Sequence, residues 1–558
     1  MELLTYSAPE PAGAAPHHAE LNSPPEPCLA CPRHAQLLDA RQQAGYWKAM
    51  HQGALARLTA AQQEIEQLRA QLRLREHQLF GRRSEQSTSR PDHNPADPGD
   101  DRAATTDAPA PKRRRGRQRG QASPRRRDYS HLPTTTEDCD LTDEQRRCPC
   151  CGLPYQPFPG TEDGELIEVE VQAHRRVYRR HRYRPTCACA GRPGILTAPG
   201  PAKLLPKTRL GISAWVHALL DKYAFGRPSH RLLQDWRTIG LDVAAGTLTD
   251  GFRRLVPLFE PLYDAIVAHQ QGEHRWHADE TRWLVFVAVE GKAGYRWYLW
   301  VFRSDDAVAF VLDPSRSHAT PEGHLGDTAE GILNVDRYSA YKALALVKAG
   351  QVILAFCWAH VRRDFLGVAR AWPAQQRWAL GWVTAIAELY HCNERRLEVR
   401  EDSEAFAQRD LDLRAAVAAL EARRAAALAE PGLHPAREKV LVSLGEHWSG
   451  LTVFVEHSEV PMDNNAAERA LRGAVVGRKN YAGSGALWSG RLLAVMLSLL
   501  GTLGRWRLNA RAWLTRYCEA CAAAGGQAPA EAERWLPWNL SEAERQALAE
   551  EPARQDSS

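Results

Sequence analysis

Three acidic side chains stand at positions that suit metal-dependent chemistry. Asp279 lies in the stretch His274–Glu290, whose alternating and then continuous apolar residues predict paired strands. Asp336 ends a second apolar run, and Glu468 lies one turn inside a helix predicted after the cluster Asp463–Asn465. Carboxylates are hard oxygen ligands that suit Mg²⁺ or Mn²⁺, and such ions activate water or hydroxyl nucleophiles. The sequence therefore predicts a divalent-metal site if folding brings these acids together.

Glu468 also has two ordinary structural explanations. Asn465 and Glu468 have the spacing of a capping box, in which the acid satisfies backbone donors at a helix start. Glu468 and Arg472 are spaced for an ion pair on one helix face. The spacing alone leaves these alternatives open.

The elements around these acids predict an α/β fold. Further strands are expected at 295–303, 307–312 and 352–356, and helical patterns follow the later ones. Strands followed by alternating strands and helices describe a mixed sheet covered by helices. The long interval before Glu468 contains a mostly helical pattern from Trp378 to Leu444, which we expect to be a helical insertion at about 375–450.

Cysteines upstream of the acids predict a zinc ribbon at 137–200. The chain has 12 cysteines, and a chain that stays in a reducing compartment uses clustered cysteines for metal more often than for disulfides. Cys150 offers a competing ligand, the second pair has one intervening residue instead of two, and free thiols are the alternative. The expected ligands of one structural Zn²⁺ are two close pairs: Cys148, Cys151, Cys187 and Cys189.

Basic residues are concentrated in a few segments, although the formal net charge is only +5. Lys112–Arg127 holds nine Lys or Arg and no acid, a density that suits a nucleic-acid backbone, and a solvated linker is the alternative. Basic and aromatic residues alternate in His174–Arg184, as in a hairpin that faces DNA. The residues predicted to contact DNA are Arg113, Arg114, Arg115, Arg179, Arg180, Arg472, Arg478 and Lys479.

The N-terminal part has a heptad pattern. Leu58, Ile65, Leu72 and Leu79 recur every seven residues, which predicts a coiled coil at 54–83 and self-association into a homo-oligomer. An amphipathic helix packed on its own protein is the alternative. Residues 1–53 are expected to be a disordered lead-in and residues 84–136 a basic disordered linker.

Helical patterns also flank the predicted sheet. Three helices expected within 205–260 suggest a helix-turn-helix, although a plain helical connector has the same pattern. Residues 491–545 are expected to be helical, and the apolar stretch Leu492–Leu503 is shorter than the ~20 residues of a membrane span. The N-terminus lacks the pattern of a secretory signal. We therefore expect a cytoplasmic protein with no membrane partner.

Four motifs follow one another along the chain: HADETRW at His277–Trp283, DRYSAY at Asp336–Tyr341, CWAHVRR at Cys357–Arg363 and DNNAAER at Asp463–Arg469. With these motifs in this order, the sequence resembles the transposases of the insertion sequence 66 group. The heptad helix, the cysteine cluster and the C-terminal helices correspond as well, so the resemblance covers most of residues 50–540.

The resemblance implies a DDE-type catalytic domain at 270–490 with a ribonuclease-H-like sheet. It places the catalytic, metal-binding triad on Asp279, Asp336 and Glu468. Two Mg²⁺ or Mn²⁺ ions would serve cutting at transposon ends and joining of the freed 3′-hydroxyl to target DNA. The implied partners are double-stranded DNA, a second copy of the chain and accessory transposon proteins. The alternatives are a non-catalytic, transposase-derived DNA-binding regulator and a nuclease with the same core.

Overall fold

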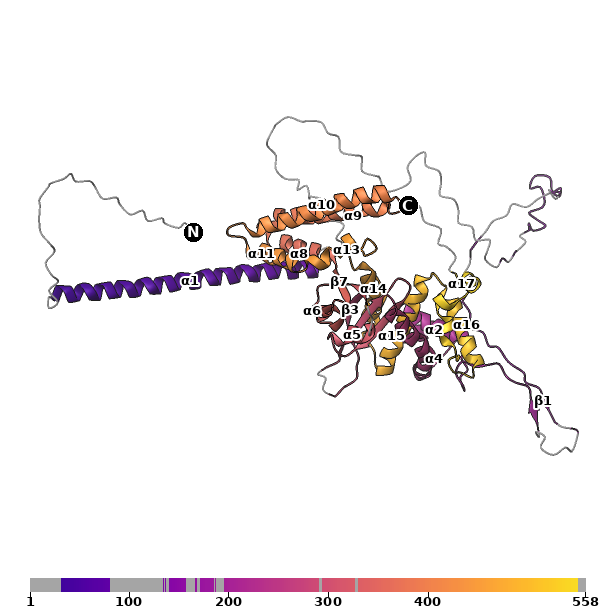
Figure 1. The fold of residues 1–558 in the computed structure, drawn as a ribbon. Coiled ribbons are helices and arrows are strands. Elements are labelled where there is room, and N and C mark those ends of the chain that lie inside the picture. The colour runs from indigo at the N-terminus through magenta and orange to yellow at the C-terminus, as the bar shows by residue number, and fades with distance from the viewer. Residues whose placement is uncertain are drawn as a thin grey trace, which may run out of the picture. The chain divides into compact units, whose positions relative to one another are not determined.

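The computed structural model describes residues 32–80, 134, 136, 140–156, 166–167, 171–184, 186, 195–290, 294–326 and 330–549. The chain divides into two compact units. The larger unit comprises residues 1–83 and 174–558, and the smaller comprises residues 84–173. The helices and strands in Figure 1 belong to the larger unit.

One mixed sheet of five strands forms the centre of the larger unit, in the order β5-β4-β3-β6-β7. β3, β4 and β5 pair antiparallel, whereas β3, β6 and β7 pair parallel. The stretch 274–290, expected to be paired strands, instead supplies the single strand β3, whose antiparallel partner is β4. The strands are β3 (Arg275–Leu284), β4 (Arg296–Arg303), β5 (Val308–Asp313), β6 (Gly331–Val335) and β7 (Val352–Phe356).

Helices cover both faces of this sheet, because side chains on alternate residues of a strand point to opposite faces. Trp276 and Ala278 of β3 belong to one hydrophobic cluster, which includes α8 (Trp358–Ala371). Trp283 belongs to another cluster, with α14 (Asn465–Tyr481) and α15 (Leu487–Arg505). The central strand is therefore buried on both sides, which fixes the position of Asp279 within it.

The edge strand β5 is covered by α15. The backbone N–H of Phe310 donates to Ser498 Oγ at 2.8 Å, and that of Val308 donates to Thr502 Oγ1 at 3.0 Å. α15 is long and apolar enough to cross a membrane by length and composition, but 61% of its most apolar window is buried inside the fold. It is the core helix of this sheet.

The helices at 205–260 form in the expected order but are part of the same core. They are α2 (Ile212–Leu219), the π-helical turn η2 (Leu220–Ala224), α3 (Ser229–Thr238) and α4 (Ala245–Gln271). α4 packs on α15 and β5, and its buried side chains share one hydrophobic cluster with the sheet. Arg237 and Arg253 pair with Asp242 and Asp250 at 3.0 and 2.8 Å. These helices therefore do not form a separate module.

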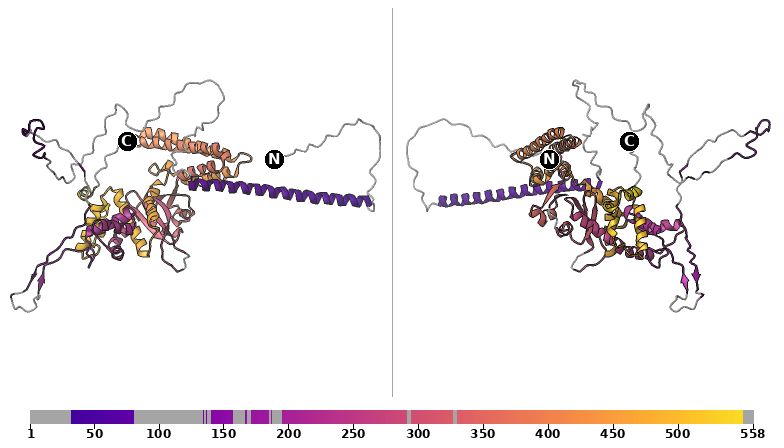
Figure 2. Two further views of the ribbon diagram at one scale, coloured as in Figure 1. Left: turned by 180° about the vertical axis from the view of Figure 1, so that it is seen from behind. Right: turned by 45° about the vertical axis from the view of Figure 1, so that its right-hand side comes forward.

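The expected insertion at about 375–450 is a set of helices packed beyond α8. Both views in Figure 2 show the orange helices α9, α10 and α11 together as one bundle. These helices are α9 (Gln376–Glu398), α10 (Ser403–Leu428) and α11 (Pro435–Glu446), after the 3-10 turn η3 (Pro373–Gln375). Two short helices, α12 (Trp448–Leu451) and α13 (Val453–Glu456), lead back toward α14.

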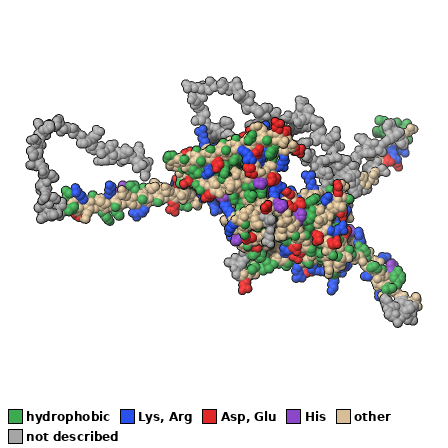
Figure 3. Space-filling model, in the orientation of Figure 1, with side chains coloured by type: hydrophobic (Ala, Val, Ile, Leu, Met, Phe, Trp, Pro, Cys, Tyr) green, Lys and Arg blue, Asp and Glu red, His purple; other side chains and the backbone are tan. Residues whose placement is uncertain are grey.

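The N-terminal helix α1 spans Pro32–Phe80 and so begins well before the expected Ala54. The extra turns are rich in Ala, Gln, Leu and Arg, which favour helix, so residues 32–53 are not the disordered lead-in that we expected. Near its C-terminal end Ala70 is buried and Arg73 Nε donates to the Ala371 carbonyl at 2.6 Å. Hydrophobic side chains otherwise reach the surface along α1 (Figure 3).

The remaining elements are short. A two-stranded ladder, β1 (Arg182–Tyr183) and β2 (Leu196–Thr197), lies in the basic hairpin region. The connections within the sheet contain α5 (Ala319–Leu325), α6 (Ser339–Lys342) and α7 (Ala345–Lys348). The C-terminal region expected to be helical contains α16 (Ala510–Ala523), η4 (Ala532–Trp535), η5 (Pro537–Asn539) and α17 (Glu542–Leu548).

Candidate active site

Asp279, within β3, and Asp336, directly after β6, lie at equivalent positions on two neighbouring parallel segments. The pairing of β3 with β6 ends at His277 and Asn334, and each aspartate lies two residues further along its own segment. Side chains two residues apart share a face, and neighbouring strands are about 4.8 Å apart. The register of the sheet therefore directs both carboxylates toward the same side.

Glu468 reaches this side from the helix α14. Asn464, at the start of that helix, donates from Nδ2 to the Ala278 carbonyl at 2.7 Å, and its Oδ1 lies 3.1 Å from His277 Nδ1. These contacts fix the first turn of α14 against the strand that carries Asp279. Because Glu468 is one turn further along, its charge lies close enough to raise the pKa of Asp279.

The structural explanations of Glu468 are not realised in the described part of the chain. The N-cap residue of α14 is Asn464, which makes no side-chain cap bond. Asn465 bonds instead to Asp463, through its backbone N–H at 3.0 Å and its side chain at 2.5 Å. The partner of the Glu468 carboxylate is Arg363, not Arg472. Glu468 is therefore neither part of a capping box nor in an ion pair along its own helix.

Arg363 of α8 holds Glu468 through two nitrogens. Its Nη1 lies 3.3 Å from Oε1 and its Nη2 lies 3.2 Å from Oε2 of Glu468. His360, one turn earlier, lies 3.2 Å from Arg363 Nη1 through Nε2. Burial, and then the charge of Arg363, lower the pKa of His360, so the imidazole is neutral near pH 7. The motif that begins at Cys357 thus supplies the counter-charge of Glu468.

The Asp279 carboxyl has a raised pKa. Burial, followed by the charge of Glu280 and the weaker charges of Asp336 and Glu468, raises its pKa to about 7, against a backbone hydrogen bond from Glu280 that lowers it. Each negative charge makes ionisation of its neighbours harder. Buried carboxylates whose negative charges repel one another are stabilised by a bound cation or a proton.

The three predicted acids are close but not fully converged. Within the described residues, only His269, Glu273 and Asp306 bring three possible ligand atoms within 4.8 Å of one another. Asp279, Asp336 and Glu468 do not meet this criterion, and Glu468 is paired with Arg363. The chemistry of the donors, three carboxylates, is what Mg²⁺ or Mn²⁺ prefers.

Glu280 has a different function from its neighbour Asp279, because it points to the opposite face of β3. Its side chain is 2% exposed and pairs with Arg316, whose Nε lies 2.7 Å from Oε1. Tyr341 donates its hydroxyl to the other carboxylate oxygen at 2.9 Å. Glu280 therefore ties β3 to the segment that follows Asp336. This role of Glu280 is not predictable from the sequence, because a buried ion pair between distant residues leaves no periodic signal.

The residues predicted to contact DNA are in different environments. Arg472 and Lys479 of α14 are exposed, whereas Arg478 donates to Thr281 Oγ1 at 3.0 Å and to the Arg282 carbonyl, and so anchors α14 to β3. Arg179 and Arg180 are exposed beside the β1–β2 ladder, where Arg180 Nε donates to the Ala198 carbonyl at 2.6 Å. Arg113, Arg114 and Arg115 lie outside the described residues.

The smaller unit contains half of the predicted zinc ligands. Cys148 and Cys151 flank a tight turn in which the Gly152 N–H donates to the Cys148 carbonyl at 2.9 Å. Backbone N–H groups of Cys150 and Cys151 lower the pKa of Cys148 to about 7. A thiolate is the form that binds zinc, so the turn favours a ligand at this position. Cys187 and Cys189 lie outside the described residues.

Comparisons with known proteins identify the family of this chain. The family described as "Transposase IS66 family" matches residues 207–492, which include all three acids. Two similar proteins of Sinorhizobium fredii (strain NBRC 101917 / NGR234) are named "Uncharacterized protein y4jD" and "Uncharacterized protein y4qI". The first is 30% identical, covering 86% of this chain and 96% of that protein, and the second is 28% identical, covering 75% and 77%. No solved structure matches. The match spans half of the chain and the strands and helices that carry the acids, so the chain belongs to the IS66 family of transposases.

Proposed function

We propose that this protein cuts transposon ends to free a 3′-hydroxyl and joins that hydroxyl to target DNA, on a ribonuclease-H-like sheet with Asp279, Asp336 and Glu468 as metal ligands. The membership in a transposase family supports DNA transposition, and the mixed sheet agrees with such a core. The observation that carries the assignment of residues is the equivalent position of the two aspartates on adjacent parallel strands. Glu468 adds a third acid from the helix fixed against the same strand.

The residues of the proposed site have separate roles. Asp279, Asp336 and Glu468 would hold the divalent ions, and Glu468 would leave its contact with Arg363 to do so. A pair of Mg²⁺ ions would supply activation of the attacking oxygen and stabilisation of the leaving oxygen. The guanidinium of Arg363, whose paired nitrogens suit phosphate oxygens, would contact the phosphate being cut. Neutral His360 beside it contacts the same region of the backbone.

DNA binding and location follow from the same proposal. The exposed Arg472 and Lys479 beside the acids hold the strand at the scissile phosphate. The exposed Arg179 and Arg180, together with the basic segment that includes Arg113, Arg114 and Arg115, hold duplex DNA further away through its backbone. The protein would act in the cytoplasm on double-stranded DNA, with accessory transposon proteins as further partners.

An assay with the DNA that flanks the gene tests the proposed function. The full-length protein is incubated with labelled duplexes from both flanks and a target plasmid, in Mg²⁺ or in EDTA. We expect Mg²⁺-dependent nicking at a terminal repeat and covalent joining to the plasmid. Cutting without joining would indicate a nuclease, and binding without cutting would indicate a regulator; either result would contradict the proposal.

The raised pKa of Asp279 predicts that metal binding depends on pH. Below about pH 7 the metal-free site keeps a proton that Mg²⁺ must displace, so affinity should fall about tenfold for each pH unit below that value. In the same range the metal-free folded state holds more protons than the unfolded state, so its free energy of unfolding falls as pH rises toward 7. Calorimetric Mg²⁺ titrations across this range measure the effect, and a pH-independent affinity would rule it out.

Structural zinc is the second metal that we propose. Cys148 and Cys151, with Cys187 and Cys189, should hold one Zn²⁺ per chain, and Cys148→Ser should lower the zinc content several-fold because a thiolate ligand is lost. Metal analysis of protein purified under reducing conditions gives the measurement. Cys518→Ser is the matched control, because Cys518 is buried in α16 and should not affect zinc. Stoichiometric zinc in the Cys148→Ser protein would exclude Cys148 as a zinc ligand.

Self-association through α1 is proposed from its exposed heptad side chains. Leu58, Ile65 and Leu72 are each at least half exposed in the single chain, although each gains about 1.5 to 3 kcal/mol when fully buried. The double variant Leu58→Asp/Ile65→Asp should therefore dissociate the oligomer in analytical ultracentrifugation. Arg57→Asp/Glu64→Lys, on the same exposed helix, is the control that keeps the apolar seam. An unchanged oligomer in the first variant would place the interface elsewhere.

A further inference from the structure

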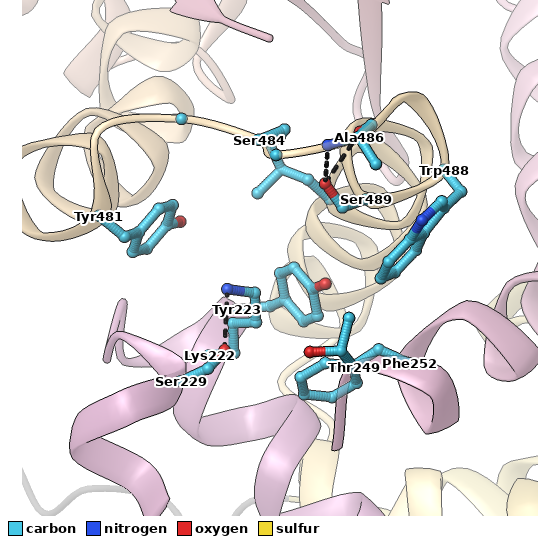
Figure 4. Close-up of a pocket in the computed structure, with 13 residues that line it drawn as sticks. Lys222, Tyr223, Ser229, Thr249, Phe252, Tyr481, Ser484, Ala486, Trp488 and Ser489 are labelled. Carbon is cyan, nitrogen blue, oxygen red and sulfur yellow. Dashed lines mark hydrogen bonds between the residues drawn. The ribbon is translucent and has the colours of Figure 1, made fainter. Parts of the chain in front are cut away.

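A pocket of about 370 Å³ lies where the segment 222–252 meets the loop that follows α14. Figure 4 shows Lys222, Tyr223 and Ser229 facing this loop, with Tyr481 and Trp488 on either side. This volume is within the usual range of small-ligand pockets, about 300 to 1,000 Å³. The lining also includes Thr249, Phe252, Ser484, Ala486 and Ser489.

Lys222 places a mostly buried positive charge in this pocket. Its Nζ lies 3.4 Å from Ser229 Oγ and 4.8 Å from the ring centre of Tyr481. Burial lowers the pKa of Lys222, and no ion pair with a carboxylate is found for it among the described residues. A buried ammonium without a counter-charge is costly. An anionic group of a ligand would supply the missing charge.

Aromatic side chains make up much of the remaining wall. Tyr223, Phe252, Tyr481 and Trp488 contribute four rings around the space beside Lys222. Flat heterocycles bind between such rings by stacking, and a neighbouring cation adds to the attraction. A ligand with both a planar base and a phosphate satisfies the rings and the lysine together. That combination is a nucleotide.

The pocket lies at the end of α14, the helix that carries Glu468 near its start. α14 carries Glu468 near its start and Tyr481 at its end, which are about 20 Å apart at a rise of about 1.5 Å per residue. About six nucleotides span this length at about 3.4 Å per phosphate. Arg472 and Lys479 are exposed on α14 between these two points. A strand of this length, held by these residues at the scissile phosphate, is long enough to reach the end of α14 beside the pocket.

The walls of the pocket are fixed before any ligand binds. Gly226 has a φ of +65° and would place a Cβ 3.2 Å from Gly477 Cα, so the turn before α3 approaches α14 closely. Asn480 Nδ2 donates to the Gly226 carbonyl at 2.9 Å. On the other wall, Ser484 N–H donates to the Leu284 carbonyl at 2.8 Å and so joins the loop to β3. A preformed site of this kind loses little free energy to ordering.

We propose that this pocket takes an extrahelical nucleotide of the bound DNA, with its base among the aromatic rings and its phosphate at Lys222. The inference rests on the proposed function, because it requires a DNA strand along α14. Turning a nucleotide out of the stack about six positions from the cut would hold the end in register with the acids.

Photocrosslinking with the full-length protein tests the proposal. The probe is a labelled duplex from the gene flank with iododeoxyuridine placed at one position at a time, and crosslinked peptides are identified by mass spectrometry. We expect crosslinks to Tyr481 or Trp488 from one or two neighbouring positions only. Lys222→Met should reduce their yield and weaken DNA binding on the order of tenfold, because a charged phosphate contact is lost. Its thermal stability should be equal or higher, because an unpaired buried charge is removed.

Lys439→Met is the matched control. It removes one exposed lysine charge from α11, which has no part in the proposed DNA path, so it should leave binding and the crosslinked residues unchanged. Crosslinks elsewhere on α14 with none in the pocket would overturn the inference and leave the proposed function intact. Equal yields from Lys222→Met and wild type would also overturn it. Absence of DNA binding by the wild type would count against the proposed function itself.

Discussion

Asp279→Asn, Asp336→Asn and Glu468→Gln should each slow Mg²⁺-dependent strand cleavage by at least about a thousandfold, as expected when several kcal/mol of metal-ion stabilisation is lost. Each change keeps size and polarity but removes one negative charge from the proposed site. The three losses should not add, because the ligands act as one unit. Single-turnover cleavage of a labelled transposon end gives the rate, and a binding assay on the same duplex should show nearly unchanged affinity.

A matched variant separates the loss of a site carboxylate from a general loss of charge. Glu519→Gln makes the same chemical change on the exposed side of α16 and should leave the cleavage rate unaltered. Near-normal cleavage by Glu468→Gln would remove this residue from the site and would favour a purely structural role of its contact with Arg363. Loss of DNA binding in all three variants would indicate instead that the acids support folding.

The Asp410→Leu protein should lose roughly 3 to 5 kcal/mol of stability in the helical insertion, because a buried arginine would lose its counter-charge. Arg396 of α9 has a side chain that is 1% exposed and lies 2.7 Å from Asp410 Oδ1. Its other hydrogen bonds go to the carbonyls of Val455 and Phe454, at 3.0 and 2.7 Å. These neutral acceptors cannot balance the charge. Hydrogen exchange of α9 and α10 in the full-length protein measures the local free energy of opening.

Two further variants make this test specific. Asp412→Leu removes an acid from the same helix whose partner is the half-exposed Arg409 at 3.2 Å, so it should cost less than about 1 kcal/mol. Arg396→Met/Asp410→Leu removes both charges and should recover much of the stability, because buried ion pairs are often replaced by apolar residues without loss. Equal effects of Asp410→Leu and Asp412→Leu would show that burial of Arg396 does not determine the cost.

The elements that carry the acids were predictable because their signals are local. The apolar runs that lead to Asp279 and Asp336 have the period of buried strands, and the cluster before Glu468 marks a helix start. The register that places the two aspartates side by side has no such signal. It depends on pairing between segments separated by two other strands and a helix. Only the resemblance to a family linked these positions in advance.

The contacts around the acids were not predictable for the same reason. Arg363 with Glu468 and Arg316 with Glu280 join residues far apart in the chain, and neither pair follows a repeat. The helices at 205–260 show a related limit. Their spacing predicts amphipathic helices correctly, but an apolar stripe does not specify what covers it. Here the stripe of α4 packs on α15 and β5, and not within a separate DNA-binding module.

The early start of α1 follows from amino-acid composition and not from heptad spacing. Residues 32–53 lack a regular seam, so a search for coiled-coil spacing begins at Ala54. Their composition of strong helix formers nevertheless favours continuous helix, and the structure extends the helix to Pro32. Proline is well tolerated at a helix start, where its missing N–H has no partner in any case.

The packing of α15 along the edge strand β5 limits how copies of this protein can assemble. An uncovered edge strand offers a row of backbone donors and acceptors to which a second chain can add a strand. In β5 the outward N–H groups of Val308 and Phe310 are occupied by the hydroxyls of Thr502 and Ser498. Strand addition at this edge would first have to remove α15 from the hydrophobic core. A second copy of the chain therefore cannot extend the sheet at β5, so the strand register that brings Asp279 and Asp336 side by side is protected from this edge.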